Sequence, residues 1–227
     1  TIHFETLGCR LNQDETEGAG RAFIEAGFMS DLEPFTAQTP VQEEVVLGVV
    51  NTCTVTGKAE QKARRVIRLV LDKCPHAAII VTGCYAEVDG MAIKQIDADR
   101  IAIVPGTKKY LLSSIAHQFS GAEHITAAQI ESFVLQHKET AGNTVNGATG
   151  KLDAFTLYTP VFEKHSRASI KIEDGCNNAC TFCRIHLARG RAVSLSVSDV
   201  LDRVQLLEQQ GIAEVVFTGV NLSQYAG

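Results

Sequence analysis

The sequence predicts an α/β protein in which a parallel-sheet domain is followed by the beginning of a second βα domain. Three observations predict it: strand and helix signals alternate over residues 1–120, a small, polar stretch follows, and a new strand–helix–strand rhythm starts near residue 168. The 227 residues are 45% hydrophobic and 21% charged. Those proportions are ordinary for a globular chain that buries a core in one or two domains.

The first 120 residues read as repeated βα units. Short apolar runs suited to buried parallel strands occupy residues 2–7, 45–50, 78–82 and 101–104. Helical patterns occupy residues 12–26, 58–73, 89–96 and 107–119. In the second of these, Ala63, Ile67 and Val70 fall on one face. Alternating units of this kind predict a parallel sheet with helices on its faces.

The pattern is lost over residues 121–165, which we expect to be a linker. Residues 142–150 are small and polar, a linker composition. Strand signals at 168–172 and 213–218 then flank a helix at 196–210. Two strands do not form an independent parallel sheet, because each needs covering on both faces. We therefore expect residues 166–227 to be the first, truncated part of a larger barrel that follows domain 1–120.

Charge and cysteine content narrow the class of protein. The net charge of −5 argues against one large nucleic-acid-binding face. Six cations near residues 164–191 still leave RNA contact open: Lys164, Arg167, Lys171, Arg184, Arg189 and Arg191. No apolar run is long enough to span a bilayer, and no signal-peptide pattern opens the chain, so we expect a cytoplasmic protein without a membrane partner. Seven cysteines, an odd number, indicate metal ligands or reactive thiols.

The most specific motif is a triplet, Cys176-x-x-x-Cys180-x-x-Cys183, in a loop directly after a predicted strand. Three thiolates can hold three irons of a [4Fe–4S] cluster and leave the fourth iron open to a ligand. The alternative is a zinc knuckle completed by His186 or His165. Zinc sites usually add a second Cys-x-x-Cys pair, which is missing around this triplet, so the pattern favours iron and sulfur.

A second set of cysteines is dispersed in the sequence. Cys9, Cys53 and Cys84 each follow a predicted strand. The carboxyl ends of parallel strands meet at one edge of a sheet, and binding sites form there, so these three can converge. Ordinary buried packing explains one such cysteine easily, but three in matching places poorly. Cys74 precedes a proline, matches no motif and is interpreted as a bystander thiol.

The triplet, with Phe182 between its last two cysteines, resembles the signature of radical S-adenosylmethionine (SAM) enzymes. The resemblance implies that Cys176, Cys180 and Cys183 bind a [4Fe–4S] cluster whose open iron chelates SAM. It also implies that Phe182 lies beside the adenine. The segment Thr218-Gly219-Val220-Asn221 resembles the family's glycine motif, which meets the methionine amino group, so Thr218, Gly219 and Asn221 are expected SAM contacts.

The N-terminal half resembles the N-terminal domain of methylthiotransferases within that superfamily. The resemblance rests on Thr-Leu-Gly-Cys-Arg-Leu-Asn-Gln at 6–13, Asn-Thr-Cys-Thr-Val-Thr at 51–56 and Val-Thr-Gly-Cys-Tyr-Ala-Glu at 81–87. It implies a second [4Fe–4S] cluster on Cys9, Cys53 and Cys84 that takes part in sulfur delivery, and a radical SAM (β/α) partial barrel after it. After the triplet, the chain departs from the family pattern at His186-Leu187, Val193 and Leu195.

The resemblance implies an enzyme that adds a methylthio group to C2 of threonylcarbamoyladenosine beside the tRNA anticodon. Isopentenyladenosine in tRNA and a ribosomal-protein aspartate are the alternative substrates within the family. Two [4Fe–4S] clusters and SAM are the implied cofactors, and tRNA and a flavodoxin- or ferredoxin-like electron donor the implied partners. Two rivals remain: a radical enzyme whose N-terminal cluster only relays electrons, and a non-catalytic zinc-binding adaptor.

Overall fold

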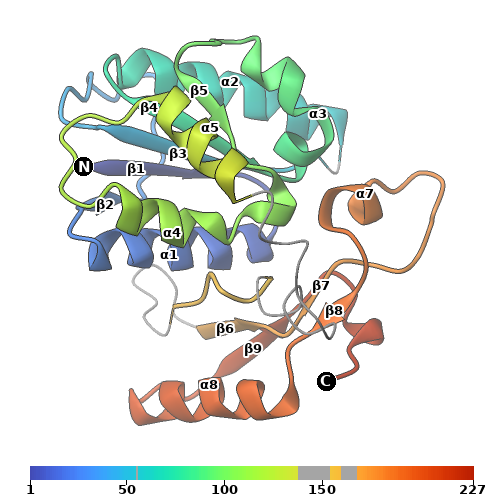
Figure 1. The fold of residues 1–227 in the computed structure, drawn as a ribbon. Helices are drawn as coiled ribbons and strands as arrows, with labels where there is room; N and C mark the ends of the chain where they lie inside the picture. Colours follow the sequence, from blue (N-terminus) through green and yellow to red (C-terminus); the bar gives the residue numbers. More distant parts are fainter. Residues whose placement is uncertain (55, 138–153, 160–167) are drawn as a thin grey trace.

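The computed structural model describes residues 1–54, 56–137, 154–159 and 168–227 (Figure 1). Its N-terminal part is built on a five-stranded sheet in the order β2-β1-β3-β4-β5, with every neighbouring pair parallel. The strands are β1 (Ile2–Thr6), β2 (Ser30–Asp31), β3 (Leu47–Thr52), β4 (Ala78–Gly83) and β5 (Ile101–Ile103). The predicted α/β class is confirmed, and within this sheet only the two-residue edge strand β2 was not expected.

Helices cover both faces of this sheet (Figure 1). On one face lie α1 (Arg10–Glu25), α4 (Leu111–Gln118) and α5 (Ala127–Gln136), whose apolar side chains pack with Phe4, Val49 and Ile80 of the strands. On the other lie α2 (Gly57–Lys73) and α3 (Cys84–Lys94), which pack on Val50 and Val81. A 3₁₀ turn, η1 (Gly106–Lys108), joins β5 to α4. Because helices bury both faces of the sheet, the strands contain apolar runs.

Part of the stretch expected to be a linker is helical. Helix α5 starts at a capping box, in which Thr126 and Gln129 exchange hydrogen bonds, and its Ile130 and Val134 are buried in the N-terminal core. Residues 154–159 also pack, because Leu157 joins the N-terminal core and Phe155 joins the core of the following unit. The polar stretch 142–150 lies outside the described residues.

The second unit is the predicted βαβ arrangement. β6 (Ala168–Lys171) pairs in parallel with β9 (Val215–Thr218), and α8 (Val197–Gln209) connects them. Ser196 caps α8 by accepting a hydrogen bond from the backbone of Asp199. Three short elements were not predicted: the antiparallel pair β7 (Glu173–Asp174) and β8 (Val193–Ser194), and α7 (Ile185–Arg189). A 3₁₀ turn, η3 (Leu222–Gln224), follows β9.

The two apolar departures from the family pattern have a packing role here. Leu195 is 3% exposed and belongs to the core of the βαβ unit, and Val193 is partly buried against it. Within the described residues, no helix is both long and apolar enough to cross a membrane.

Candidate iron–sulfur sites and the contact between them

The three dispersed cysteines all lie at the carboxyl edge of the N-terminal sheet. Thr52 of β3 pairs in register with Gly83 of β4, and Cys53 and Cys84 are the residues that directly follow these neighbouring strands. Cys9 follows β1, which flanks β3 on its other side, and is the residue before α1. Cys53 and Cys84 are buried, whereas Cys9 is exposed. Cys74 ends α2, beyond the opposite edge of the sheet.

A glycine keeps the space beside Cys53 open. Gly8 has φ +103°, a conformation that side chains rarely adopt. A Cβ added there would lie 2.6 Å from Cys53 Cβ and 2.9 Å from its Sγ. The loop that carries Cys9 therefore lies directly against Cys53, and only glycine leaves room around that thiol.

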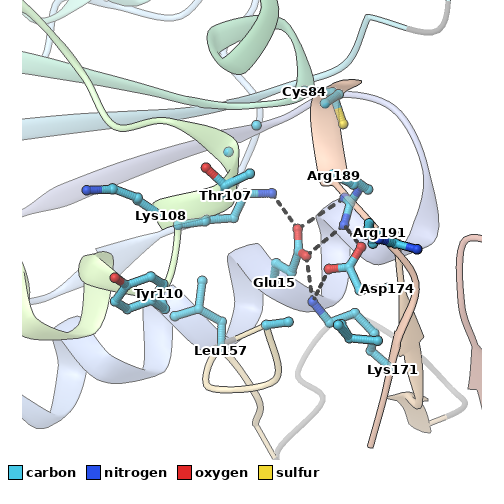
Figure 2. Close-up of a pocket in the computed structure, with 16 residues that line it drawn as sticks. Glu15, Cys84, Thr107, Lys108, Tyr110, Leu157, Lys171, Asp174, Arg189 and Arg191 are labelled. Carbon is cyan, nitrogen blue, oxygen red and sulfur yellow. Dashed lines mark hydrogen bonds and ion pairs between the residues drawn. The ribbon is translucent and has the colours of Figure 1, made fainter. Parts of the chain in front are cut away.

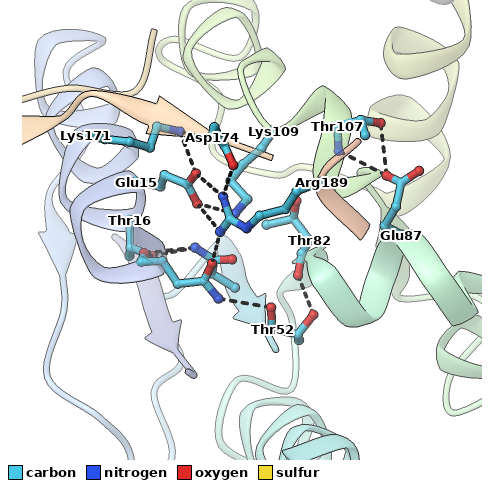
Figure 3. Close-up of polar contacts among 12 residues, drawn as sticks. Glu15, Thr16, Thr52, Thr82, Glu87, Thr107, Lys109, Lys171, Asp174 and Arg189 are labelled. Carbon is cyan, nitrogen blue, oxygen red and sulfur yellow. Dashed lines mark hydrogen bonds and ion pairs between the residues drawn. The ribbon is translucent and has the colours of Figure 1, made fainter. Parts of the chain in front are cut away.

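Buried hydrogen bonds hold the three cysteine loops in register (Figure 3). The Nδ2 of Asn12 donates to the carbonyl oxygen of Leu7 at 2.7 Å and to that of Thr52 at 3.0 Å. The hydroxyl of Thr52 donates to the carbonyl oxygen of Thr82 at 2.6 Å and accepts from the backbone N–H of Ala86 at 3.3 Å. Each loop is thus tied to its neighbour within three residues of its cysteine.

Asn51 adds a second tie between the sheet and α1. Its Nδ2 donates to the carbonyl oxygen of Asn12 at 3.0 Å and to the hydroxyl of Thr16 at 3.1 Å. Asn51, Asn12 and Thr16 are all buried. The amide side chains of Asn12 and Asn51 therefore hold the cysteine loops in position.

Soft thiol donors on three adjacent strand ends, with a glycine keeping space beside one of them, fit a [4Fe–4S] cluster. Among the described residues, no group of three or more His, Cys, Asp or Glu side chains is arranged to hold a metal ion. The sheet topology thus brings the three loops to one edge, and the role of Cys9, Cys53 and Cys84 as ligands remains a prediction.

The contiguous triplet lies in the loop after β7. Cys180 is exposed, and Cys176 and Cys183 are half-buried. Two N–H groups donate to the Sγ of Cys176: the backbone of Asn178 at 3.5 Å and the Nδ2 of Asn221 at 3.7 Å. Hydrogen bonds to sulfur are characteristic of iron–sulfur thiolates, whose potential they tune, so this loop also fits a cluster.

The predicted SAM contacts lie at the end of β9, beside that loop. Glu173 Oε2 accepts a hydrogen bond from the backbone N–H of Asn221 at 2.7 Å, and a Cβ at Gly219 would lie 2.9 Å from the same oxygen. Burial raises the pKa of Glu173. Thr218 donates to Asp14 of α1 at 3.3 Å, and Phe182 is 90% exposed. The structure therefore brings Asn221 to Cys176 and leaves the ring of Phe182 open to solvent.

A buried ion cluster joins the two halves of the chain (Figures 2 and 3). The carboxylate of Glu15 in α1 contacts the Nζ of Lys109, the Nζ of Lys171 at 2.8 Å and the guanidinium of Arg189 at 3.1 Å. Asp174 contacts Lys171 and Arg189, each at 2.9 Å. The cluster holds three cations and two carboxylates, so charge is nearly balanced inside a region that excludes water.

The ion pairs set the protonation states of the cluster. Burial raises the pKa of Glu15, but attraction to Arg189, Lys109 and Lys171 outweighs it and holds that pKa well below its ordinary value. Burial lowers the pKa of Arg189, yet Glu15, Asp174 and Cys84 together raise it well above its ordinary value. Glu15 and Arg189 are therefore both charged at neutral pH.

Beside this cluster lies a cavity of about 360 Å³, shown in Figure 2. Its walls come from both halves of the chain, and Gly83 and Cys84 form part of them. Thr107, Tyr110, Leu157 and Arg189 form others. The cavity therefore borders a candidate cluster ligand, Cys84, as well as residues of the second unit.

Among the cations grouped in sequence near residues 164–191, the four that the structure describes do not form one exposed basic face. The side chains of Lys171 and Arg189 are each 7% exposed and engaged in the ion cluster. Arg184 pairs with Glu60 of α2 at 2.9 Å. Arg191 is exposed, and Lys164 and Arg167 lie outside the described residues. Sequence spacing alone could not distinguish a buried cation from one that faces RNA.

Comparison with known proteins finds a family match for each of the two parts of the chain. Residues 1–105 match the uncharacterised protein family UPF0004, and residues 170–226 match the Radical SAM superfamily. The threonylcarbamoyladenosine tRNA methylthiotransferase MtaB of Treponema pallidum is 41% identical over 99% of this chain and 54% of its own. The protein of that name from Bacillus subtilis is 33% identical over 99% of this chain and 44% of its own.

A relative with another named substrate is similar as well. The tRNA-2-methylthio-N(6)-dimethylallyladenosine synthase of Desulfotalea psychrophila is 28% identical over 100% of this chain and 46% of its own. The chain spans about half the length of the curated relatives it matches.

A parallel α/β domain followed by a βαβ unit with a Cys-x-x-x-Cys-x-x-Cys loop defines a radical SAM protein, a class that implies SAM and a [4Fe–4S] cluster. Within this class, the chain is similar over nearly its whole length to the radical SAM methylthiotransferase family. The predicted likeness to its threonylcarbamoyladenosine branch is confirmed by the names that the more similar relatives carry.

Proposed function

We propose that the protein to which this chain belongs adds a methylthio group to C2 of threonylcarbamoyladenosine in tRNA. The observation that carries the proposal is the presence of both cysteine sets in one chain, one at strand ends and one in the βαβ loop. Radical generation needs one cluster with an open iron, so a second set of three cysteines calls for a second task. The high identity to proteins named for this modification supports sulfur transfer as that task.

The residues divide between the two tasks as follows. Residues 1–120, together with α5, form the domain in which Cys9, Cys53 and Cys84 hold a sulfur-donating [4Fe–4S] cluster. Residues 166–227 begin the radical SAM barrel, in which Cys176, Cys180 and Cys183 hold the other cluster. When bound there, cluster and SAM supply a carbon radical able to attack an unactivated C–H bond. Asn221, Gly219 and Thr218 then bind and orient SAM, with Phe182 against its adenine.

Partners follow from the chemistry. The reaction consumes electrons, so the protein needs a reductant of the flavodoxin or ferredoxin class. The substrate is tRNA, and the cavity beside Cys84 is the candidate binding site for the modified base, because it borders both units of the described chain.

Nucleoside mass spectrometry of tRNA tests the function. A strain that lacks the gene is expected to accumulate threonylcarbamoyladenosine and to lose its 2-methylthio derivative, and the wild-type gene restores it. Loss of the methylthio group from dimethylallyl- or isopentenyl-type adenosine instead would move the protein to the other tRNA branch. Unchanged tRNA in the deletion strain would refute a role in tRNA methylthiolation altogether.

A further inference from the structure

Arg189 connects the two candidate cluster loops. It ends α7, six residues after Cys183, and its side chain is 7% exposed. One Nη donates to Asn12 Oδ1 at 2.8 Å, and the other donates to Asp174 at 2.9 Å and to Glu15 at 3.1 Å. A single planar group therefore bonds both halves of the chain (Figure 3).

On the N-terminal side, Arg189 holds the residue that sets the register of the cysteine loops. Asn12 uses its Nδ2 on the carbonyl oxygens of Leu7 and Thr52, and its Oδ1 accepts from Arg189. Its orientation is fixed by these three bonds together, because the amide donates from one end and accepts at the other. Loss of Arg189 would leave the buried Oδ1 without this donor.

On the other side, Arg189 holds the start of the contiguous triplet. Asp174 lies two residues before Cys176, and its Oδ1 accepts from both Arg189 and the backbone N–H of Gly175. The backbone N–H of Cys176 donates in turn to the carbonyl oxygen of Gly190, the residue after Arg189, at 3.0 Å. The loop of Cys176 and the end of α7 are thereby fixed to each other.

We propose that Arg189 is a positioning residue that fixes the separation of the two cysteine sets and so couples radical formation to sulfur transfer. This inference rests on the proposed function. A guanidinium suits the task, because its rigid planar fork of donors serves three acceptor side chains at once, whereas a lysine ammonium is a point charge on a flexible stem. Misplacement of reacting groups by about 1 Å costs about 100-fold in rate.

The experiment compares Arg189→Met and Arg189→Lys with wild type in the full-length, reconstituted protein. Deoxyadenosine and 2-methylthio nucleoside are measured in the same reaction, together with iron content. Arg189→Met is expected to keep both clusters and to cleave SAM, while the ratio of deoxyadenosine to product rises by about one to two orders of magnitude. Arg189→Lys is expected to restore part of the coupling.

Two readouts do not depend on turnover. The distance between the two reduced clusters, measured by pulsed electron paramagnetic resonance, is expected to broaden in Arg189→Met. In the metal-free full-length protein, hydrogen exchange of the backbone at residues 9–16 and 185–191 is expected to speed up together. A variant that only lowered global stability would speed exchange throughout the chain.

Arg203→Met is the matched control. Arg203 is also a half-buried arginine between packed segments: it donates to the carbonyl oxygen of Phe155 at 2.9 Å and stacks over the ring of Tyr158. It contacts neither cysteine loop, so its loss is expected to leave the product ratio and the inter-cluster distance unchanged. If Arg189→Met fails to fold, Glu15→Gln removes the charge and one acceptor oxygen of a partner of the same guanidinium and is expected to raise the ratio in the same direction.

The outcomes are distinct. Wild-type protein that cleaves SAM but makes no methylthio product on any tRNA refutes the proposed function. Active wild type with an Arg189→Met variant of unchanged product ratio and unchanged inter-cluster distance overturns the role of Arg189. Equal uncoupling in Arg203→Met also overturns it, because the effect would then not be specific to the contact between the loops.

Discussion

Asn12, at the start of α1, lies against Thr52 at the end of β3, and its Nδ2 donates to the Thr52 carbonyl oxygen at 3.0 Å. This bond ties the loop of Cys9 to the loop of Cys53. Both residues are fully buried, so the bond is shielded from competing water. An amide side chain therefore joins the two loops at the N-terminal candidate site.

Replacing that amide tests its importance. Asn12→Asp keeps the shape but turns two donated hydrogen bonds into carboxylate–carbonyl repulsion, so we expect a loss of about 1–3 kcal/mol in the free energy of unfolding. Urea denaturation measures it. Gln13→Ala, at the half-buried neighbouring position, is the control and is expected to change little. Equal stability of Asn12→Asp and wild type would contradict the structural role given to the amide.

Gly8 gives a second test, with a built-in comparison. Gly8→Ala and Gly27→Ala place a side chain at similar positive φ values, +103° and +92°, but only at residue 8 does the new Cβ meet Cys53. Backbone strain is common to both, so we expect each to cost about 1 kcal/mol or more. The clash should make Gly8→Ala alone lose iron from the N-terminal site. Iron analysis after reconstitution decides, and equal iron in both variants would contradict the close approach.

The two cysteine sets are expected to fail differently. Cys53→Ala should abolish methylthiolation but still allow SAM cleavage to deoxyadenosine, whereas Cys180→Ala should abolish both. Parallel assays of deoxyadenosine and modified nucleoside measure the two outcomes. If Cys53→Ala forms the methylthio product at the wild-type rate, the N-terminal site is not the sulfur donor.

The same clusters can be counted by metal analysis. Reconstituted full-length protein is expected to bind two [4Fe–4S] clusters, and the variant with Cys176, Cys180 and Cys183 all changed to Ala should retain one. Iron, sulfide and the visible spectrum measure this directly. Stoichiometric zinc without iron would instead support the zinc-binding adaptor.

Glu15 predicts a dependence of stability on pH. Although burial acts to raise its pKa, Arg189, Lys109 and Lys171 hold it well below the ordinary value. A depressed carboxyl pKa stabilises the fold above the unfolded pKa, about 4.3, and this contribution is lost as the pH falls through the folded value. The difference in melting temperature between wild type and Glu15→Gln is therefore expected to be largest near neutral pH and to shrink in acid. A difference that grows in acid would contradict the sign.

Cys74 is expected to be chemically inert in the folded protein. It is completely buried, and burial raises the pKa of its thiol to about 12. The thiolate is the reactive form, so alkylation of the metal-free native protein at mildly alkaline pH should spare Cys74 and label the exposed Cys180. Peptide mass spectrometry distinguishes the two. Labelling of Cys74 as fast as Cys180 would show that the α2 terminus opens.

The sequence predicted the parallel sheet because its strands are buried on both faces and read as continuous apolar runs, such as residues 78–82. It also predicted which strand ends carry cysteines. It did not predict β7, β8 or α7, which are too short to show a period. Nor did it predict the ion cluster: Glu15 and Lys109 are 94 residues apart, and only the fold shows that they are partners.

Helix α5 was missed for a different reason. Its capping residues, Thr126 and Gln129, were visible in the sequence, but the polar composition further along drew the whole stretch into one linker. Arg189 illustrates the reverse error. Its charge suggested a surface facing RNA, yet two carboxylates and an amide from distant segments enclose it.

The spacing of the cysteines also sets an order of events during synthesis. Cys176, Cys180 and Cys183 occupy eight consecutive residues, so their thiols are neighbours as soon as the ribosome has released that loop. Cys9, Cys53 and Cys84 become neighbours only after β1, β3 and β4 have paired. The N-terminal candidate site can therefore form only after these strands have paired. Its formation would show that the sheet has folded.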